Sequence, residues 1–472
     1  MSVLVWIDSF LLYYYAVLCV IYLALFALAL LDSLRHQQWI HTLPLDRLAT
    51  SPLAPPVSVL VPARNEAAGI VQSVESLLGL KYPDFEVVVI NDGSSDATLK
   101  RLQEAFGLIR IDFSYHARIP TARVRDVFAS PTHPRLLVCD KLPGGKADAL
   151  NAGLNLARGA YFCTVDADAV LDRDALLRVM LPVYNDRTVV ASGGVVRLAN
   201  GSVFANGRLQ EARLPRSPLE LLQVVEYLRA FLWGRQGWSA LGGLLIISGA
   251  FGIFRRELVL EIGGFRTRTV GEDMDLVVRL HRRLRQRGKP YVVRFVPDPI
   301  CWTEAPASLR QLSCQRRRWQ QGLGQSLWHS RDLLFSRRGG RIGWFIFPYQ
   351  IVFEFFGPLI ETLGLISVAA SAALGLLNQE YFFRLFLFAY LFGTFISMAA
   401  VYLEDLSYHR YRRASEVARL LLISLFDYFP YRLLINLFRI QGMFDFFRQR
   451  ARWGELARRG FTEPQGAPAH PA

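Results

Sequence analysis

Two kinds of apolar pattern divide this chain: long uninterrupted runs near both ends, and short runs broken by polar positions in between. Residues 11–31 carry no charged side chain, and a helix of about 20 apolar residues spans the hydrocarbon core of a bilayer. A cleaved signal peptide would instead have basic residues ahead of a shorter apolar stretch, whereas Asp8 is the charged residue before this run. We therefore predict a retained transmembrane helix within residues 1–43.

Apolar runs return later in the chain, from Trp344 to Leu377 and from Tyr381 to Leu403. The polar triplet 378–380 between them predicts an outer turn that joins two membrane spans. Pro348 and Pro358 interrupt the start of the first run, so this part could instead be an interfacial helix.

The last apolar region, residues 417–447, contains Asp427 and Pro430 and has arginines on both sides. Since both flanks are then cytoplasmic, it is either a hairpin of two spans or a pair of helices that lie on the membrane surface. Residues 331–460 are thus expected to form interfacial and transmembrane helices, before a disordered tail at 461–472. Three carboxylates here either line a polar pathway, because a carboxylate facing lipid is costly, or pair between helices and at the interface: Glu354, Glu361 and Asp427.

Residues 44–330 form the remaining domain, in which short β-type runs alternate with amphipathic helical stretches. This alternation predicts an α/β fold, a parallel sheet with helices on both faces. In such sheets, ligands bind at the carboxyl ends of the strands. The predicted strands include residues 56–63, 85–90, 135–140 and 161–165, and the predicted helices include 67–80 and 146–159.

Polar residues follow three of these strands, and one cleft could collect them all. Asp166 and Asp168 alternate along a strand, so their carboxylates share one face and suit a hard divalent cation that holds a diphosphate. The alternative is a solvated turn. Asp92 could accept a hydrogen bond from a nucleobase imide, while Asp96 is expected to cap the next helix. The residues at the three strand ends are Arg64, Asn65 and Glu66; Asn91, Asp92 and Gly93; and Asp166 and Asp168.

Two predicted helix starts carry further chemistry. Gly144 and Gly145 precede a helix that opens with Lys146, which is typical of an anion site, although the spacing of a P-loop is absent. Asp273 opens another helix, where it could serve as a rigid base that deprotonates a hydroxyl. The helix dipole alone would also favour carboxylates at this position.

A third helix gathers an amide, a cation and an indole on one face, because Gln315, Arg318 and Trp319 stand at positions i, i+3 and i+4. An indole face can stack on a sugar and an arginine can bind phosphate. The neighbouring Arg316 and Arg317 fit a basic helix at the membrane surface.

Composition and charge place the chain at a membrane. Hydrophobic residues make up 52%, and 54 Lys and Arg against 40 Asp and Glu give a net charge of +14. Because many arginines flank apolar runs, the charge indicates a membrane protein and not nucleic-acid binding. The positive-inside rule puts the N-terminus outside, residues 44–330 in the cytoplasm and several spans in the cell membrane. Five scattered cysteines without a C-x-x-C pair exclude a typical zinc or redox motif and fit a reducing compartment.

Taken in order, these motifs resemble those of the processive family-2 glycosyltransferases, the superfamily of cellulose, chitin, hyaluronan and poly-N-acetylglucosamine synthases. The resemblance covers about residues 57–319 and implies a GT-A (Rossmann-like) catalytic domain, a UDP-sugar donor, Mg²⁺ or Mn²⁺, and inversion at the anomeric carbon. It implies a membrane-embedded enzyme that adds sugars to a growing polysaccharide and extrudes this exopolysaccharide across the bilayer. The residues that match the family's motifs are Glu66, Asp92, Lys146 and Asp166 for the nucleotide, Asp166 and Asp168 for the metal, Asp273 as the catalytic base, and Gln315, Arg318 and Trp319 for the diphosphate and acceptor.

The chain also departs from the family pattern. Gly271 stands where a threonine is usual before the acidic pair, a change expected to be tolerated because this position is not the base. The insert at residues 200–243 is expected to form a helix on the bilayer near the translocation entrance. No domain for a cyclic dinucleotide is visible, so a separate regulatory or export subunit is a possible partner. Residues 248–252 take the place of the acceptor-site loop.

Two other functions stay open from the sequence. A non-processive transferase could glycosylate a lipid acceptor, although the helix with Gln315, Arg318 and Trp319 argues for processivity. A membrane scaffold or receptor could carry a degenerate transferase domain, but its acids should then be lost, and here Asp92 and Asp273 stand beside the intact pair at 166 and 168. The identity of the sugar and its linkage cannot be read from the sequence.

Overall fold

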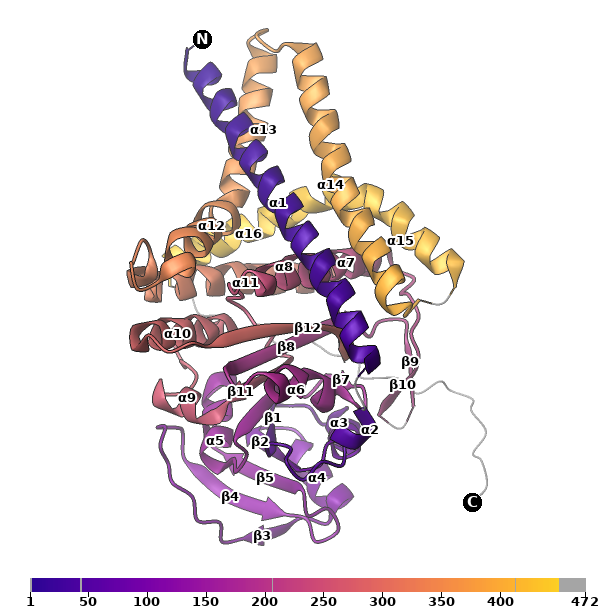
Figure 1. Ribbon diagram of the computed structural model, residues 1–472, viewed down its shortest axis with the longest axis vertical. Coiled ribbons are helices and arrows are strands. Elements are labelled where there is room, and N and C mark those ends of the chain that lie inside the picture. Colours follow the sequence, from indigo (N-terminus) through magenta and orange to yellow (C-terminus); the bar gives the residue numbers. More distant parts are fainter. Residues whose placement is uncertain (1, 43–44, 206, 412, 450–472) are drawn as a thin grey trace.

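The computed structural model describes residues 2–42, 45–205, 207–411 and 413–449. An α/β domain forms the lower part of the molecule, and helices from both ends of the chain rise above it (Figure 1). The predicted tail at 461–472 lies outside the described residues.

A ten-stranded sheet forms the centre of the α/β domain, with the order β3-β4-β5-β2-β1-β6-β11-β8-β12-β7. The four predicted strands are confirmed as β1 (Val57–Ala63), β2 (Phe85–Asp92), β5 (Leu136–Lys141) and β6 (Tyr161–Val165). They run parallel to one another and are buried on both faces, as their unbroken apolar runs require.

Beyond these four strands the predicted parallel sheet is only partly confirmed, because β12 pairs in parallel with β8 but four other strands do not follow this direction of pairing. β11 runs antiparallel to both its neighbours, and β3, β4 and β7 are antiparallel as well. A strand buried on both faces has the same apolar pattern in either direction, so the sequence does not distinguish the two. The remaining strands are β3 (Ile109–Ile111), β4 (Val124–Ala129), β7 (Val170–Leu171), β8 (Val189–Leu198), β11 (Phe251–Arg255) and β12 (Val292–Thr303).

Helices cover the sheet and carry the motifs. α5 packs against β1 and β2, where a Cβ atom on Gly153 would come within 2.8 Å of Ile90 Cδ1. This helix ends at Leu156 with Ala157 as its C-cap, so the predicted end at Gly159 is wrong. The helices of the domain are α2 (Leu45–Leu48), α3 (Ile70–Leu78), α4 (Thr98–Phe106), α5 (Lys146–Leu156), α6 (Ala175–Asn185), α9 (Arg256–Glu261), α10 (Glu272–Arg287) and α11 (Leu309–His329).

Three helices of the described chain are long and apolar enough to cross a membrane, at Trp6–Ile40, Phe382–Tyr408 and Ala414–Phe447. A fourth span results if the pair Ile342–Phe355 and Gly357–Ala373, bent by 47°, counts as one. The helices concerned are α1 (Ser2–Thr42), α12 (Phe347–Tyr349), α13 (Gly357–Ala373), α14 (Gln379–Tyr408), α15 (Ala414–Phe426) and α16 (Arg432–Phe447), with π-helical turns η3 (Ile342–Ile346), η4 (Gln350–Phe355) and η5 (Asp427–Tyr431).

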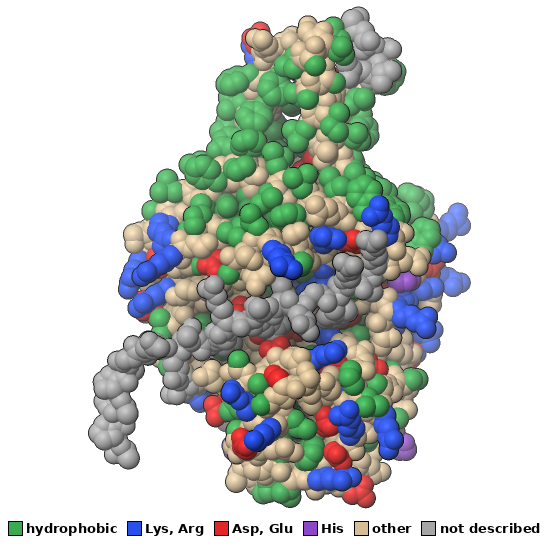
Figure 2. Space-filling view, turned by 180° about the vertical axis from the view of Figure 1, so that it is seen from behind, with side chains coloured by type: hydrophobic (Ala, Val, Ile, Leu, Met, Phe, Trp, Pro, Cys, Tyr) green, Lys and Arg blue, Asp and Glu red, His purple; other side chains and the backbone are tan. Residues whose placement is uncertain are grey.

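These helices take two orientations. α1, α13 and α14 rise together away from the α/β domain, whereas α15 and α16 lie across their base (Figure 1). The arrangement favours the surface-lying pair over the hairpin for residues 417–447. Hydrophobic side chains cover the rising part, whereas Lys and Arg side chains are spread over the part of the molecule beneath it (Figure 2).

The insert at residues 200–243 forms the hairpin of β9 (Val203–Ala205) and β10 (Arg208–Glu211), then α7 (Pro218–Leu228), η1 (Arg229–Arg235) and α8 (Gln236–Ala240). Its helices lie between the sheet and the apolar helices α1, α14 and α15, and their predicted place at the bilayer surface stays a prediction. Trp233 Nε1 donates to the Tyr22 carbonyl of α1 at 3.0 Å, and Gly237 packs directly on Leu25.

Candidate active site

A cavity of about 530 Å³ lies between the carboxyl edge of the sheet and the membrane helices. Lys146 and Asp166 line its end at the sheet, and Asp273 and Trp319 line its middle. The neighbouring strands end level with one another, since Ala63 pairs with Asn91 and Asn91 with Asp140. The polar ends of these strands therefore lie at one edge of the sheet, as expected for parallel strands.

Asp92 is buried beneath the glycine turn that precedes α5. Its Oδ1 accepts from Lys141 Nζ at 2.7 Å and from Gly144 N at 2.8 Å, and its Oδ2 accepts from Gly145 N at 2.7 Å. Gly145 has a φ of 89°, which favours glycine at this position. These hydrogen bonds fix the turn that directs Lys146 toward the cavity. In this structure Asp92 therefore stabilises the backbone of the turn.

Lys141 is a functional residue that the sequence reasoning missed. Its side chain is fully buried and its Nζ lies 2.7 Å from Asp92 Oδ1 and 2.6 Å from Asp148 Oδ1. A lysine at the end of a strand usually faces water, so only a buried carboxylate on the next strand could have signalled this pair.

Glu66 and Asp96 lie at the neighbouring strand ends. The Glu66 amide donates to Thr98 Oγ1 at 2.9 Å, and Asp96 accepts from the amides of Ala67 and Thr98. Partial burial opposes ionisation, but the hydrogen bonds from Thr98 outweigh it and lower the pKa of Asp96. Asp96 thus satisfies the start of α4 as expected, although Ala97 is the N-cap residue.

The predicted nucleotide and metal residues reach the cavity only in part. Lys146 and Asp166 line it, whereas Glu66, Asp92 and Asp168 are not among the described residues of its wall. Their direct contact with a nucleotide or metal therefore stays a prediction.

Lys146 forms an ion pair with Asp166, and its Nζ lies 3.7 Å from Glu272 Oε1. Burial alone would lower the pKa of Lys146, but the carboxylates of Asp166 and Glu272 outweigh it and raise this pKa. Burial raises the pKa of Glu272, which the Lys146 ammonium only partly opposes. The sheet end of the cavity thus keeps one firmly charged ammonium group beside two carboxylates.

Asp166 and Asp168 offer the oxygen ligands that Mg²⁺ or Mn²⁺ prefers. Within the described part of the chain, no group of three or more His, Cys, Asp or Glu side chains is placed to hold a metal. A site of two carboxylates suits a cation that takes its other ligands from a diphosphate and water. The residues therefore fit a metal that binds together with the donor.

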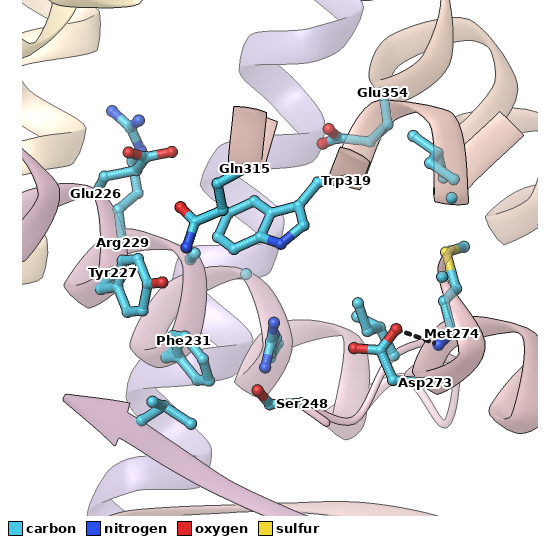
Figure 3. Close-up of a pocket in the computed structure, with 18 of the residues that line it drawn as sticks. Glu226, Tyr227, Arg229, Phe231, Ser248, Asp273, Met274, Gln315, Trp319 and Glu354 are labelled. Atoms are coloured by element: carbon cyan, nitrogen blue, oxygen red, sulfur yellow. Dashed lines mark hydrogen bonds between the residues drawn. The ribbon is translucent and has the colours of Figure 1, made fainter. Parts of the chain in front are cut away.

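Asp273 lies in the first turn of α10 and faces the cavity (Figure 3). Its Oδ1 accepts from Met274 N at 2.8 Å, and its Oδ2 accepts from Gly249 N at 3.3 Å. Gly249 belongs to the loop at residues 248–252 that was predicted as the acceptor site. The carboxylate is therefore held at the cavity wall by two backbone amides.

Gln315, Arg318 and Trp319 all line the cavity, so their predicted common face is confirmed. Trp319 is 44% exposed and projects from α11 between Tyr227 and Asp273 (Figure 3). Its indole can accept a sugar ring on its open side.

The interpretation of Arg316 as a membrane-surface residue is wrong. Arg316 is only 2% exposed, its guanidinium lies 4.2 Å from the centre of the Trp319 ring, and it pairs with Glu226 Oε2 at 2.7 Å. It also donates to Gln315 Oε1 at 2.7 Å. The arginine thus orients both the indole and the amide of the motif.

The family model described as glycosyltransferase like family 2 matches residues 55–322. The chain belongs to this family. The family-2 match covers every predicted site residue, from Glu66 to Trp319, and identifies the protein as a glycosyltransferase.

The family-2 relatives with known names include polysaccharide synthases. The poly-beta-1,6-N-acetyl-D-glucosamine synthase of Staphylococcus epidermidis is 25% identical over 343 residues, 72% of either chain. The synthase of the same name from Staphylococcus aureus (strain COL) is 26% identical over 297 residues, 62% of this chain and 60% of that relative.

The structure of a mannosyltransferase shares the fold. The mannosyltransferase PcManGT from Pyrobaculum calidifontis, in complex with GDP-Man and Mn²⁺, has a TM-score of 0.54 and 22% identity, and the match covers 92% of this chain and 99% of that chain. The predicted GT-A architecture is thereby confirmed.

Proposed function

We propose that this family-2 glycosyltransferase is a processive, inverting polysaccharide synthase. It takes a UDP-sugar, of which UDP-N-acetylglucosamine is the first candidate because of the named synthase relatives, and adds its sugar to a growing chain. The observation that carries the proposal is a single cavity that begins at Lys146 and Asp166 and continues to side chains of the membrane helices, such as Tyr22 and Arg432. A polymer would need such a continuous path from the site of transfer to the bilayer.

The membrane end of the cavity has a polar wall, which supports this path. Arg432 pairs with Glu361, Arg439 with Glu354, and Arg229 with Asp427. Charged groups within membrane segments usually mark a functional route. The three carboxylates thus fit both alternatives from the sequence. All three pair with arginines, and two of them, Glu354 and Asp427, also line the cavity and so could form a polar pathway.

The proposed transfer uses residues that already face the cavity. Asp273 takes the proton from the acceptor hydroxyl as its oxygen attacks the anomeric carbon. The new glycosidic C–O bond forms while the bond to the diphosphate oxygen breaks, and its electron pair leaves with UDP. Lys146 and Arg318 hold the growing negative charge of the leaving group.

A Mg²⁺ or Mn²⁺ ion held by Asp166 and Asp168 would add positive charge at the diphosphate. Trp319 holds the acceptor sugar by stacking, so that the product stays bound for the next addition. The proposed location is the cell membrane, with the catalytic domain in the cytoplasm where UDP-sugars are available.

The test is a panel of radiolabelled UDP-N-acetylglucosamine, UDP-glucose and GDP-mannose, incubated with the full chain in lipid nanodiscs. The products are sized by gel filtration. We expect one UDP-sugar to give a long polymer, and we expect chelation of divalent cations to abolish its synthesis. A single labelled sugar on a lipid would overturn processivity and favour the lipid-acceptor transferase.

The matched variant for the metal is Asp168→Ala, which should abolish transfer while expression and membrane insertion persist. Turnover by this variant without divalent cation would contradict the metal assignment. Absence of transfer from any donor by the wild-type chain would favour the scaffold alternative.

A further inference from the structure

Four side chains form a continuous row of ring and cation contacts along the wall of the cavity. The guanidinium of Arg235 lies 3.9 Å from the centre of the Phe231 ring, and the ring centres of Phe231 and Tyr227 are 5.7 Å apart. Tyr227 and Trp319 follow at 6.3 Å. All four residues line the cavity, and Figure 3 shows Phe231, Tyr227 and Trp319 of this row. The row therefore joins the acceptor-stacking indole to the Arg235 cation on η1.

Arg235 differs from the arginines at the membrane end of the cavity. Arg229, Arg432 and Arg439 each pair with a carboxylate. Among the described residues, the guanidinium of Arg235 has no hydrogen bond or ion pair, and its Nη1 is buried without a partner. A buried donor without a partner is uncommon in folded proteins and is often explained by a ligand that supplies the acceptor.

The electrostatics point to the acceptor end and not to the diphosphate end. Burial lowers the pKa of Arg235 to about 10, and Asp273 and then the phenol of Tyr227 oppose this effect. The group is therefore still a cation at neutral pH. The acid that acts on it is the proposed base, whereas the Asp166 carboxylate near the donor is paired with Lys146.

We infer that Arg235 binds an oxygen atom of the acceptor sugar next to the hydroxyl that Asp273 deprotonates. Two contacts on one sugar ring, one from Asp273 and one from Arg235, fix its rotation over the Trp319 indole. Arg235 is then the residue that selects which hydroxyl attacks, and thus the linkage of the product. This inference rests on the proposed function and adds a specificity determinant to it.

The thermal midpoint of an Arg235 variant distinguishes ligand binding from a purely structural role. A structural role would make the protein less stable when Arg235 is replaced. The buried Nη1 of Arg235 has no hydrogen-bond acceptor in the described chain, and stacking on Phe231 replaces the lost hydration of the cation only in part, which destabilises the folded state. Arg235→Gln should therefore leave the thermal midpoint of the protein unchanged or higher. Strained or unpaired groups kept in spite of such a penalty are typical of functional sites.

The test measures acceptor and donor separately, with UDP-N-acetylglucosamine as donor and a soluble N-acetylglucosamine oligosaccharide as acceptor. Arg235→Gln should raise the acceptor KM at least about tenfold, the loss expected for one hydrogen bond to a charged group. The donor KM and the hydrolysis of donor by water should stay within about twofold. Arg235→Lys should recover part of the loss, and linkage analysis of the Arg235→Gln product should detect a second linkage.

Arg317→Gln is the matched control. Like Arg235→Gln, this variant removes one positive charge, but from α11. Arg317 pairs with Asp445 and is not among the residues that line the cavity, so the acceptor KM of the Arg317→Gln variant should not change. An unchanged acceptor KM in Arg235→Gln, or an equal loss in acceptor and donor KM, would overturn the inference. A wild-type chain that makes only single transfers would contradict processivity, while the effect of Arg235 on the acceptor KM would still be measurable.

Discussion

Asp273 and Asp275 stand two positions apart in the first turn of α10, yet their surroundings differ. Asp275 is fully buried and pairs with Arg266 at 2.9 Å and with Arg279 at 2.8 Å. Asp273 faces the cavity and accepts only from backbone amides among the described residues. Asp275 is occupied by two arginines and is not among the described residues that line the cavity, so it is removed from the candidates for the base.

Asp273→Asn is therefore expected to retain UDP binding and to lose transfer. The amide keeps an oxygen for the backbone donors but cannot take a proton, so the rate should fall by about 10² to 10⁴. The measurements are UDP affinity by calorimetry and incorporation of radiolabelled sugar. Glu272→Gln is the comparison: because Glu272 faces Lys146, this variant should alter donor affinity instead. The reverse pattern, with full transfer in Asp273→Asn and none in Glu272→Gln, would make Glu272 the base.

At this scale the sequence predicts residue types better than their partners. Asp273, Gln315, Arg318 and Trp319 were found because their spacing places them on a helix start or a helix face. The unpaired guanidinium of Arg235 could not be found in the same way. Its character depends on what surrounds it in three dimensions, and a single arginine in an insert has no periodic signal.

The crossing of α10 and α11 depends on two glycines. A Cβ atom on Gly271 would lie 2.8 Å from the Cα of Gly322, and the reverse contact is equally short. The two helices therefore meet backbone to backbone, which places Asp273 and Trp319 on the same cavity. This contact explains why the chain has glycine where the related motif has threonine.

Gly271→Thr should consequently be damaging, although threonine is the usual residue of the family at this position. Even Gly271→Ala should lower the free energy of unfolding by about 1–3 kcal/mol, the range for an overpacked core. The thermal midpoint in detergent and the transfer rate would both report the change. Gly69→Ala is a suitable control, because its added Cβ meets nothing within 4 Å. A fully stable and active Gly271→Thr would contradict the close crossing.

The contact between α1, α6 and β12 makes the stability of the folded state depend on pH. Asp298 of β12 is buried, with His36 Nε2 at 2.7 Å and Arg178 Nη1 at 2.6 Å. Burial alone would raise the pKa of Asp298, but the bonds from His36 and Arg178 outweigh it and lower this pKa. A carboxylate with a lowered pKa stabilises the folded state above its ordinary value of 3.8, and this contribution is lost as the pH falls through the folded-state pKa.

The thermal midpoint should therefore drop as the pH is lowered from about 5 to 3, a range set by that pKa. Asp298→Asn should have a lower midpoint near neutral pH and a flatter profile in acid. The profile is measured by tryptophan fluorescence in buffered detergent. Equal slopes in the wild type and the variant would exclude Asp298 as the source of the acid sensitivity.

Among the elements, the parallel core could be predicted and its continuation could not. The sequence runs that form β1, β2, β5 and β6 are short, apolar and bounded by turn residues. Each strand can therefore be predicted from its own residues alone. The direction of β11 follows from the path of the chain through the insert, which no local pattern encodes. The burial of η1 and α8 likewise depends on α1, which is distant from them in sequence.

For the whole molecule, the change from an apolar projection to a lower part that carries Lys and Arg (Figure 2) supports the predicted topology. With α1, α13 and α14 as spans and α15 and α16 lying across their base, both α1 and α14 end on the cytoplasmic side. Reporters inserted after His36 and at Gly460 should read as cytoplasmic, and one at Asn378, between α13 and α14, should read as external. An external signal at Gly460 would show that residues 417–447 cross the membrane once more.

The packing of α1 on the insert also has a consequence for biosynthesis. Tyr22 and Leu25 of α1 contact Trp233 and Gly237 of the insert. The first helix to be synthesised therefore packs against a segment that is translated much later. At a synthesis rate of about 5–20 residues per second, translation from Thr42 to Arg229 takes roughly 10–40 s. As the predicted membrane span, α1 would remain without its partner during this interval, and the insert could not complete its packing. A chain without α1 should therefore aggregate as it is made, instead of yielding a soluble enzyme.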